Sequence, residues 1–578
     1  MKQTRLLNLV VGGSYVQDER VAGCAVSQNL YAESVEEASN GFYYTTALRS
    51  VEGERVVLDV TYVADANNQG CRGLFVASDD TIFAAFGRSV VRISKNPVTG
   101  EYRYERIYTQ DIETICPVRF CETGGINSHV VWIDGTEYVK AYPLEPEKAT
   151  SQGIAVPVKF RTPLRVYLTS DEIQDSVNEH VVPTSICSLS GSLVINDPMN
   201  DTWYFTDPYA LGGTTYTRSV YDLDANGNIQ YESGTYKVKT RQVRLSSEEP
   251  TSLTAYLWLD RYSKPHFQTA EYAADNVAGM VCVGDILVVM GSKSLQFYTQ
   301  QSSTDAQGFS SLVFSSVNRN IRDLGVKSFD SVAVVDGKAV FLGSSTRGER
   351  SVWVTDGNAP VRISTNAIER EMEGHDISRA HACGWMNNGH QFYCITIPSI
   401  HKTFCYDFAT RQWHNRSSRL EDGTDSNWWV RYCANAGGDI VVAADRTRKL
   451  AVLDKDKFDD YLGRPIIKRR TCPILMSDFS PFIVNDLQLV WNTGTTKDVT
   501  NAQGARDPVV MLEVSTDGGN TFGEERWAYG GRTGEYGHRS IWYGIGAGTL
   551  FVFRFTISDR VNVVITGAKV SHTRLAHF

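Results

Sequence analysis

The chain has 578 residues, of which 42% are hydrophobic and 21% are charged, and its formal net charge is −9. Because one hydrophobic core stops growing at about 250–300 residues, this length predicts two or more modules, and the hydrophobic content excludes a disordered chain. The acidic balance argues against a protein whose main task is to grip nucleic acid, since that binding depends on Lys and Arg neutralising phosphates.

Between residues 74 and 453 the chain repeats one local pattern. A short apolar run leads through a turn rich in Gly, Asp, Asn or Ser into a second apolar run, which is typical of a β-hairpin. The strongest example is Asp336-Gly337, because Asp-Gly accommodates the positive φ angles of a two-residue type I′ turn. The predicted hairpins lie at 74–86, 130–139, 193–205, 286–298, 332–342, 392–406 and 440–453.

The later hairpins recur at intervals of about 50 residues, which is the range of propeller blades. We therefore predict an all-β fold with a β-propeller of six or seven blades. The interval between the hairpins at 193 and 286 is too wide for one blade, so we expect an insertion around 208–280, including a surface arm at 209–230. Helical periodicity is nearly absent, and the best candidates for short helices are 366–372, capped by Ser364, and Ser170-Asp171-Glu172.

Beyond Pro465 the predicted strands become longer, at 487–491, 509–514, 550–557 and 561–570. This change predicts a propeller over residues 1–464 and a C-terminal β-sandwich-like module over residues 465–578. The same strands could instead close the ring of blades.

The most specific short motif is Ser-Thr-Asp-Gly-Gly-Asn-Thr-Phe at 515–522. It resembles the Asp-box hairpin that occurs in sialidases and in many other β-proteins. We interpret it as a structural turn in which an aspartate accepts turn amides, a glycine tolerates an unusual φ, and the final aromatic packs into the core. The residues expected to form this turn are Ser515, Asp517, Gly519, Thr521 and Phe522.

A sialidase would carry several such motifs, together with an arginine cluster and a tyrosine nucleophile. Arg88, Arg347 and Arg431 are candidate arginines, but the sequence does not bring them together. The usual signatures of hydrolases, zinc proteases and nucleotide-binding enzymes are missing. We therefore predict that the protein is not an enzyme and has no catalytic, cofactor-binding or metal site.

Two further features bear on the setting of the protein. The eleven cysteines are scattered without a CxxC pair, so we expect reduced core residues and synthesis in a cytosol. No stretch of about 18 apolar residues occurs, so no helical membrane span is expected.

Five segments carry a resemblance that extends over most of the chain. They are 29–33 (Asn-Leu-Tyr-Ala-Glu), 291–298, 351–369, 406–413 and 514–525. In this order they resemble the packaged-DNA stabilisation proteins, or tail hub proteins, of short-tailed bacteriophages. Gln296 stands where that family usually has Glu.

The resemblance implies a structural hub or nozzle protein of the virion tail, assembled in the host cytoplasm. It implies a homo-oligomeric ring, with six copies expected, below the portal and adaptor proteins. Such a ring would extend and seal the DNA exit channel, retain the packaged genome and carry the tail needle, spikes or fibres. Double-stranded DNA would pass through without sequence-specific binding.

Two other functions stay open at this point. One is a tail propeller that binds or depolymerises host surface glycan, which would need a carboxylate pair in a cleft. The other is a trimeric receptor-binding module with exposed aromatic platforms, for which Trp428-Trp429 and 527–529 are candidates. Tryptophan in blades is more often part of a core or an interface.

Overall fold

The computed structural model describes most of the chain, and nearly all of its regular structure is β-strand. This confirms the predicted all-β class. The described residues are 2–7, 12–17, 23–34, 46–60, 70–110, 116–125, 128–146, 158–168, 173–174, 179–207, 215–221, 230–232, 235–244, 258, 266–270, 272, 275–304, 310–317, 321–344, 350–494, 500–501, 504–505 and 507–575.

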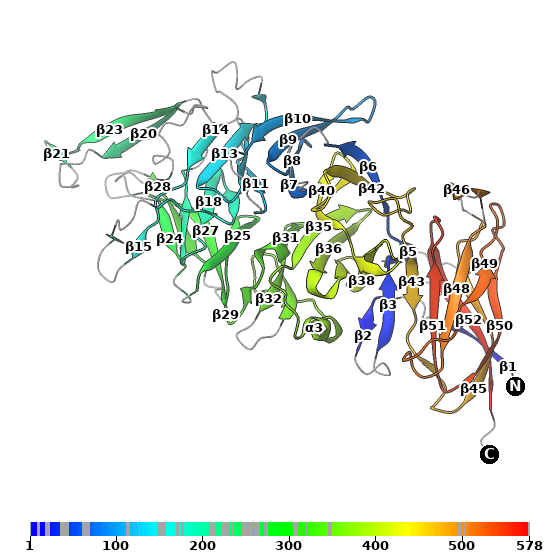
Figure 1. The fold of residues 1–578 in the computed structure, drawn as a ribbon. Helices are drawn as coiled ribbons and strands as arrows, with labels where there is room; N and C mark the ends of the chain where they lie inside the picture. The colour runs from blue at the N-terminus through cyan, green and yellow to red at the C-terminus, as the bar shows by residue number, and fades with distance from the viewer. Residues whose placement is uncertain are drawn as a thin grey trace.

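Within the described residues, seven antiparallel sheets follow one another as the blades of a propeller (Figure 1). Blade one contains β7 (Cys71–Val76), β8 (Ile82–Phe86), β9 (Ser89–Lys95) and β10 (Tyr102–Thr109), and blade two contains β11 (Arg119–Glu122), β12 (His129–Ile133), β13 (Tyr138–Pro143) and β14 (Val158–Arg161). Blade three contains β17 (Ile186–Leu189), β18 (Ser192–Asn196), β19 (Thr202–Phe205) and β24 (Phe267–Thr269), and blade four contains β25 (Val277–Val283), β26 (Ile286–Gly291), β27 (Ser294–Thr304) and β28 (Ser310–Ser316).

The remaining blades are five, six and seven, and only blade seven takes a strand from the N-terminal side of the propeller. Blade five contains β30 (Gly325–Val326), β31 (Ala333–Val335), β32 (Lys338–Ser344), β33 (Arg350–Thr355) and β34 (Val361–Arg362). Blade six contains β35 (His381–Asn387), β36 (His390–Ile397), β37 (Lys402–Asp407) and β38 (Gln412–Arg419). Blade seven contains β40 (Val430–Ala436), β41 (Asp439–Ala444) and β42 (Lys449–Asp454), and its outer strand is β6 (Gly53–Asp59). Because β40 contacts β7, the ring of blades is closed.

The hydrophobic cores lie between neighbouring blades, which explains why the blade strands are continuous apolar runs. Successive side chains of a strand point to opposite faces. In β8, Ile82, Ala84 and Phe86 pack against blade seven, whereas Phe83 and Ala85 pack against blade two. All five are buried. Both faces of each inner sheet therefore need apolar residues, and the predicted hairpins are found as paired strands for this reason.

The C-terminal part forms a β-sandwich, as predicted. One sheet contains β1 (Lys2–Leu7), β4 (Leu30–Ser34), β5 (Thr46–Ser50), β52 (Val564–Arg574), β45 (Phe482–Trp491) and β50 (Ser540–Gly548). The other contains β3 (Cys24–Gln28), β43 (Lys468–Thr471), β51 (Leu550–Ile557), β48 (Val509–Ser515), β49 (Arg526–Tyr529) and the short β44 (Leu475–Met476). Leu487, Trp542 and Phe553 belong to the core between them. The sandwich thus includes N-terminal strands, and the division at residues 464 and 465 stays a prediction.

The propeller and the sandwich share one continuous sheet. Strand β3 pairs with β43 of the sandwich and has a parallel pairing with β38 of blade six, at Gln28 and Asn415. Strand β2 (Tyr15–Val16) extends this sheet beside β3, and β39 (Asp425–Asn427) pairs with β38. A sheet that crosses the boundary resists bending between the two parts.

Between β19 and β24 the chain leaves blade three and forms a two-stranded ribbon. It consists of β20 (Thr215–Tyr221) and β23 (Val238–Arg244), with β21 (Tyr231–Glu232) and β22 (Thr235–Tyr236) between them in the sequence. In Figure 1 this ribbon projects from the propeller at the end opposite the sandwich. The predicted limits of the insertion, 208–280, stay a prediction, and β24 already belongs to blade three.

Two local predictions are corrected, and the helix candidate at 170–172 lies outside the described residues. Helix α3 (Asn366–Met372) is capped by Thr365 and not by Ser364, since the Thr365 side chain accepts a hydrogen bond from the Ile368 amide. Cys394 and Cys405 are opposite residues of β36 and β37 and form a disulfide, so the expectation of reduced cysteines was wrong for this pair.

The other short elements are η2 (Phe329–Ser331), η3 (Pro398–Ile400), β15 (Tyr167–Leu168), β16 (Ile173–Gln174), β29 (Ile321–Arg322), β46 (Thr500–Asn501) and β47 (Gly504–Ala505).

Candidate functional site

The inner strands of the propeller line a cavity of about 200 Å³ at its axis. Its walls come from β7, β11, the η2–β31 segment, β35 and β40, which belong to blades one, two, five, six and seven. The charged and titratable residues of the wall are Arg119, Asp330, His381 and Arg431. A cavity that collects charged residues from several blades is the first place to look for function.

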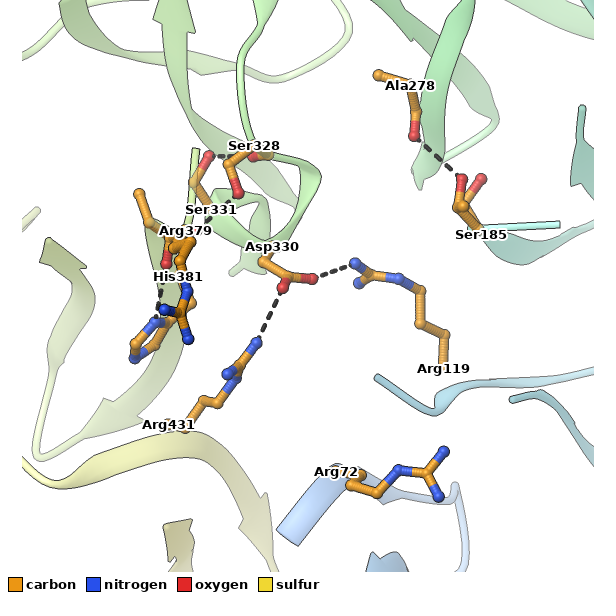
Figure 2. A network of polar contacts seen from close by, with 12 residues as sticks. Arg72, Arg119, Ser185, Ala278, Ser328, Asp330, Ser331, Arg379, His381 and Arg431 are labelled. Atoms are coloured by element: carbon orange, nitrogen blue, oxygen red, sulfur yellow. Dashed lines mark hydrogen bonds and ion pairs between the residues drawn. The ribbon is translucent and has the colours of Figure 1, made fainter. Parts of the chain in front are cut away.

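Asp330 joins two arginines from distant blades across this cavity (Figure 2). Arg431 Nη2 lies 2.9 Å from one carboxylate oxygen of Asp330, and Arg119 donates to the other. Arg431 also forms an ion pair with Asp445 at 3.4 Å. The guanidinium of Arg119 lies 4.6 Å from the centre of the Phe329 ring, a cation–π contact beside the ion pair. The cluster therefore links blades two, five and seven.

His381 lies beside this cluster but adds no positive charge to those of Arg119 and Arg431. Burial, followed by the nearby Arg431, lowers the pKa of His381 to about 4, so this histidine is neutral near pH 7. Ser328 fixes the η2 turn that carries Asp330, because its hydroxyl donates to the Ala380 carbonyl at 2.7 Å. The turn that carries the aspartate is thus tied to the residue that precedes β35 of blade six.

Arg72 forms a second buried cluster next to the axis. Its guanidinium donates to the carbonyls of Gly87 and Cys116 at 2.6 and 2.8 Å and to the Gln110 side chain at 2.7 Å. Burial lowers its pKa from the usual value. These bonds connect the first strand of blade one with the segment that leads into blade two.

The axial cluster closes the propeller to large molecules. Both oxygens of Asp330 are bonded to arginines, and these three side chains bridge the cavity. A DNA duplex, whose major groove alone is about 12 Å wide, does not fit through a channel crossed by side chains in hydrogen-bond contact. The propeller axis is therefore a structural centre, and any DNA path lies outside this single propeller.

The predicted turn at 515–522 lies after β48 in the sandwich. Asp517 accepts hydrogen bonds from the amides of Asn520 and Thr521 at 2.9 and 3.0 Å and from the hydroxyls of Ser515 and Thr521 at 2.6 Å. The Gly519 amide donates to Ser515, and Gly519 has a φ of +95°. These bonds, led by the one from Ser515, hold the pKa of Asp517 well below its usual range.

Phe522 lies outside the sandwich core. It is half-buried, and its ring centre is 3.5 Å from the guanidinium carbon of Arg554. Arg554 in turn pairs with Glu513 at 3.3 Å on the neighbouring strand β48 of the same sheet. The aromatic end of the motif thus covers an ion pair on the outer face of the sheet.

A third polar cluster lies where the propeller meets the sandwich. Asn29 is 2% exposed and has a φ of +55°. Its side chain donates to Ile467 O at 2.9 Å and exchanges bonds with Ser417, while its amide donates to Asn415 O at 2.7 Å. Sequence reasoning noted Asn29 only as part of a resembling segment. The one available signal was an asparagine between two apolar strands, because Asn tolerates positive φ.

Of the three candidate arginines, two lie within the described residues, and they have different partners. Arg431 lies at the axis, whereas Arg88 donates to the Gln110 carbonyl in blade one, and Arg347 lies outside the described residues. Asp330, which pairs with Arg431, and Arg119, which pairs with Asp330, were missed because nothing in their local sequence distinguishes them. Of the candidate aromatic residues, Trp428 is buried and donates to Glu54 at 2.6 Å, whereas Trp527 is 65% exposed.

Two further findings concern ions and membranes. Among the described residues, no group of three or more His, Cys, Asp and Glu side chains could hold a metal ion. In the same part of the chain, no helix is long and apolar enough to cross a membrane.

The fold and its two parts define a propeller–sandwich protein with a closed axis. Residues 217–458 match the family model described as bacteriophage P22 Gp10, beta-propeller, and residues 469–573 match the model described as bacteriophage P22 Gp10, beta-sandwich. Together the two models cover more than half of the chain, in the order of the two structural parts. The chain belongs to the bacteriophage P22 Gp10 family, a family of phage structural proteins.

The other comparisons add little. No curated protein matches the chain. Among solved structures, the chain is similar to the computationally designed Ika8 protein, with 11% sequence identity, 69% of this chain and 100% of that chain covered, and a TM-score of 0.31. A likeness at this level carries no argument.

Proposed function

We propose that this protein is a non-enzymatic hub, or nozzle, subunit of a short-tailed phage tail. In this proposal several copies form a ring, expected to be six-fold, below the portal and adaptor proteins. The ring extends and seals the DNA exit channel, retains the packaged genome and anchors a needle, spikes or fibres. Membership of the P22 Gp10 family supports this proposal.

The closed axis of the propeller is the observation that supports a ring of several copies. Because Asp330 holds Arg119 and Arg431 across the axial cavity, one propeller offers no passage for a duplex. A channel in an assembly of such subunits must run between copies, and a symmetric ring builds it from one repeated interface. The propellers then serve as rigid walls with few free strand edges.

The sheet that the propeller and the sandwich share also suits the proposed role as a hub subunit. Since β38, β3 and β43 form one sheet, a force on the sandwich is transmitted to the propeller through backbone hydrogen bonds. A subunit that holds a distal appendage against the pressure of a packaged genome needs such a connection. The sandwich lies at one end of the molecule, where it can meet a partner without covering the propeller (Figure 1).

The test is electron microscopy of particles assembled without this protein, with their DNA content measured in parallel. The expected particles package DNA, lose it afterwards and lack the distal tail, and supplying the wild-type protein restores both. Full, stable particles with complete tails that only fail to bind or degrade host glycan would refute the hub and favour the glycan-binding alternative.

A further inference from the structure

Four cysteines form a row across the boundary between blades six and seven. Cys383 of β35 is the register partner of Cys394 of β36, which in turn is the partner of Cys405 of β37. Cys433 of β40 donates its thiol hydrogen to Cys383 Sγ at 2.9 Å. All four side chains pack in one hydrophobic core. Cys394 and Cys405 form the disulfide of blade six, whereas Cys383 and Cys433 carry free thiols.

The two free thiols lie close enough to be joined. A disulfide bond is about 2.05 Å long, so their sulfur atoms need to approach by less than about 1 Å. The strands that carry them are already tied together beside the pair, because Asn435 of β40 accepts a hydrogen bond from the Met386 amide at 2.9 Å and donates one to the Met386 carbonyl at 2.7 Å. Rotation of the two cysteine side chains is therefore sufficient to bring the sulfur atoms into contact.

We infer that Cys383 and Cys433 form a second disulfide in an oxidising environment, and that this bond locks blade seven to blade six. The oxidant is a small disulfide such as oxidised glutathione. One cysteine thiolate attacks it, which forms a mixed disulfide and releases one glutathione thiol. The other thiolate then displaces the second glutathione. One Cys–Cys bond forms, the glutathione disulfide is broken, and the two thiol protons go to the two glutathione molecules.

The boundary between these blades is a place where a covalent bond changes the mechanics of the propeller. In the part of the chain that the structure describes, β35–β38 and β40–β42 belong to separate sheets, so packing and side-chain bonds connect blade six with blade seven. The two cysteines are 50 residues apart in the sequence. A bond between them closes this loop around most of blade six, and it opposes outward movement of blade seven and unfolding of the loop.

The surroundings of Cys433 favour the reduced form until the oxidant is abundant. Burial, followed by the hydrogen bond to Cys383, raises the pKa of the Cys433 thiol well above its usual value. Because the thiolate is the reacting form, the pair reacts slowly, and glutathione keeps such thiols reduced in a cytosol. A virion protein leaves that compartment with the particle. The timing of the lock thus rests on the proposed function, whereas the formation of the bond does not.

The experiment uses the purified full-length protein, reduced with dithiothreitol and then treated with oxidised glutathione at about pH 8.5, where an ordinary cysteine is half ionised. A parallel sample contains sub-denaturing urea, which lets blade boundaries open. Disulfides are mapped by mass spectrometry without reduction. Trypsin leaves Cys383 and Cys394 in one peptide, because no Lys or Arg lies between Arg379 and Lys402, so chymotrypsin is added to cut at the aromatic residues between them. The expected product is a peptide pair linked through Cys383 and Cys433, and dithiothreitol should separate it.

Thermal unfolding measures the effect of the bond on the propeller. Oxidation should raise the melting temperature of the wild type by about 5 °C more than that of Cys433→Ala, which can form only the bond within blade six. The matched control is Cys71→Ala, which removes another buried cysteine from the inner strand β7 of blade one. It should form the bond between blades and gain as much as the wild type.

Three outcomes would overturn the inference. The first is that no peptide linked through Cys383 and Cys433 forms, with or without urea. The second is a link between Cys383 and Cys394, which would mean that the Cys383 thiolate attacks the disulfide of blade six and releases Cys405. The third is an equal gain in melting temperature in wild type and Cys433→Ala. Because the mapping needs no virion, its result and that of the particle experiment are independent, and either can fail alone.

Discussion

Asn29 and Ser417 exchange hydrogen bonds across the boundary between the sandwich and blade six. The Ser417 amide donates to Asn29 Oδ1 at 2.9 Å, and Asn29 Nδ2 donates to Ser417 Oγ at 3.0 Å. The same amide nitrogen also reaches the Ile467 carbonyl at 2.9 Å, close to β43. One buried asparagine in a left-handed conformation therefore fixes the chain at the point where the two parts meet.

We expect Asn29→Ala to lower the free energy of unfolding by about 3 kcal/mol. The substitution removes the partner of the partly buried Ser417 amide and of the buried Ile467 carbonyl, at about 1–3 kcal/mol each. It also removes the polar side chain that lets asparagine adopt a positive φ more easily than alanine, which adds up to about 1 kcal/mol. Asn29→Gly keeps the backbone conformation and should be less damaging. Urea denaturation followed by tryptophan fluorescence measures both, and equal loss in the two variants would show that the left-handed backbone contributes nothing.

Asp330→Asn should destabilise the propeller by about 1–3 kcal/mol. It leaves Arg119 and Arg431 facing each other without a counter-charge, and the effect is moderated because the three side chains are about a quarter exposed. The control is Asp336→Asn, which removes an exposed pair with Lys338 and should cost less than about 0.5 kcal/mol. Thermal unfolding compares the melting temperatures of the two variants. Similar values would contradict a stabilising role of the axial cluster.

Acid should destabilise the protein through His414. Burial, followed by the charge of Arg416, lowers the pKa of His414 to about 3. The unfolded chain takes up this proton near pH 6.5 and the folded protein does not, so stability is present above about pH 6.5 and is lost as the pH falls towards 3. The loss amounts to about 5 kcal/mol when about 1.4 kcal/mol is taken for each pKa unit between 6.5 and 3.

Denaturant titrations from pH 7 to pH 4 measure the part of this loss that falls above pH 4. A variant His414→Gln should show a shallower dependence on pH, whereas the exposed His375→Gln should follow the wild type. Parallel curves for wild type and His414→Gln would show that other groups cause the acid sensitivity.

The turn after β48 gives a prediction about local order. Asp517→Ala removes the acceptor for the Asn520 and Thr521 amides, and because the turn is exposed we expect a loss of about 1 kcal/mol. Hydrogen exchange at these two amides should accelerate several-fold, while Glu524→Ala leaves them unchanged. Unchanged exchange in Asp517→Ala would mean that the backbone alone maintains the turn.

The parts of the fold that follow from short segments could be predicted from the sequence. Asp336-Gly337 marks a two-residue turn, and the turn around Asp517 lies within eight residues, so both are local patterns. The axial cluster is different, since Arg119 and Asp330 are 211 residues apart and no pattern connects them. The pairing of β6 with β42 was also not predicted, because a single strand does not show which distant strand it joins.

The origin of the outer strand of blade seven has a consequence for synthesis of the protein. Asp59 leaves the ribosome roughly 390 residues before its partner Lys449, which at about 5–20 residues per second is a delay of roughly 20–80 s. During this time β6 is a strand without its partner, and blades one to six form without the seventh. A nascent chain in this state exposes the faces of blades one and six that later pack against blade seven, so closure of the ring waits for the synthesis of the last blade.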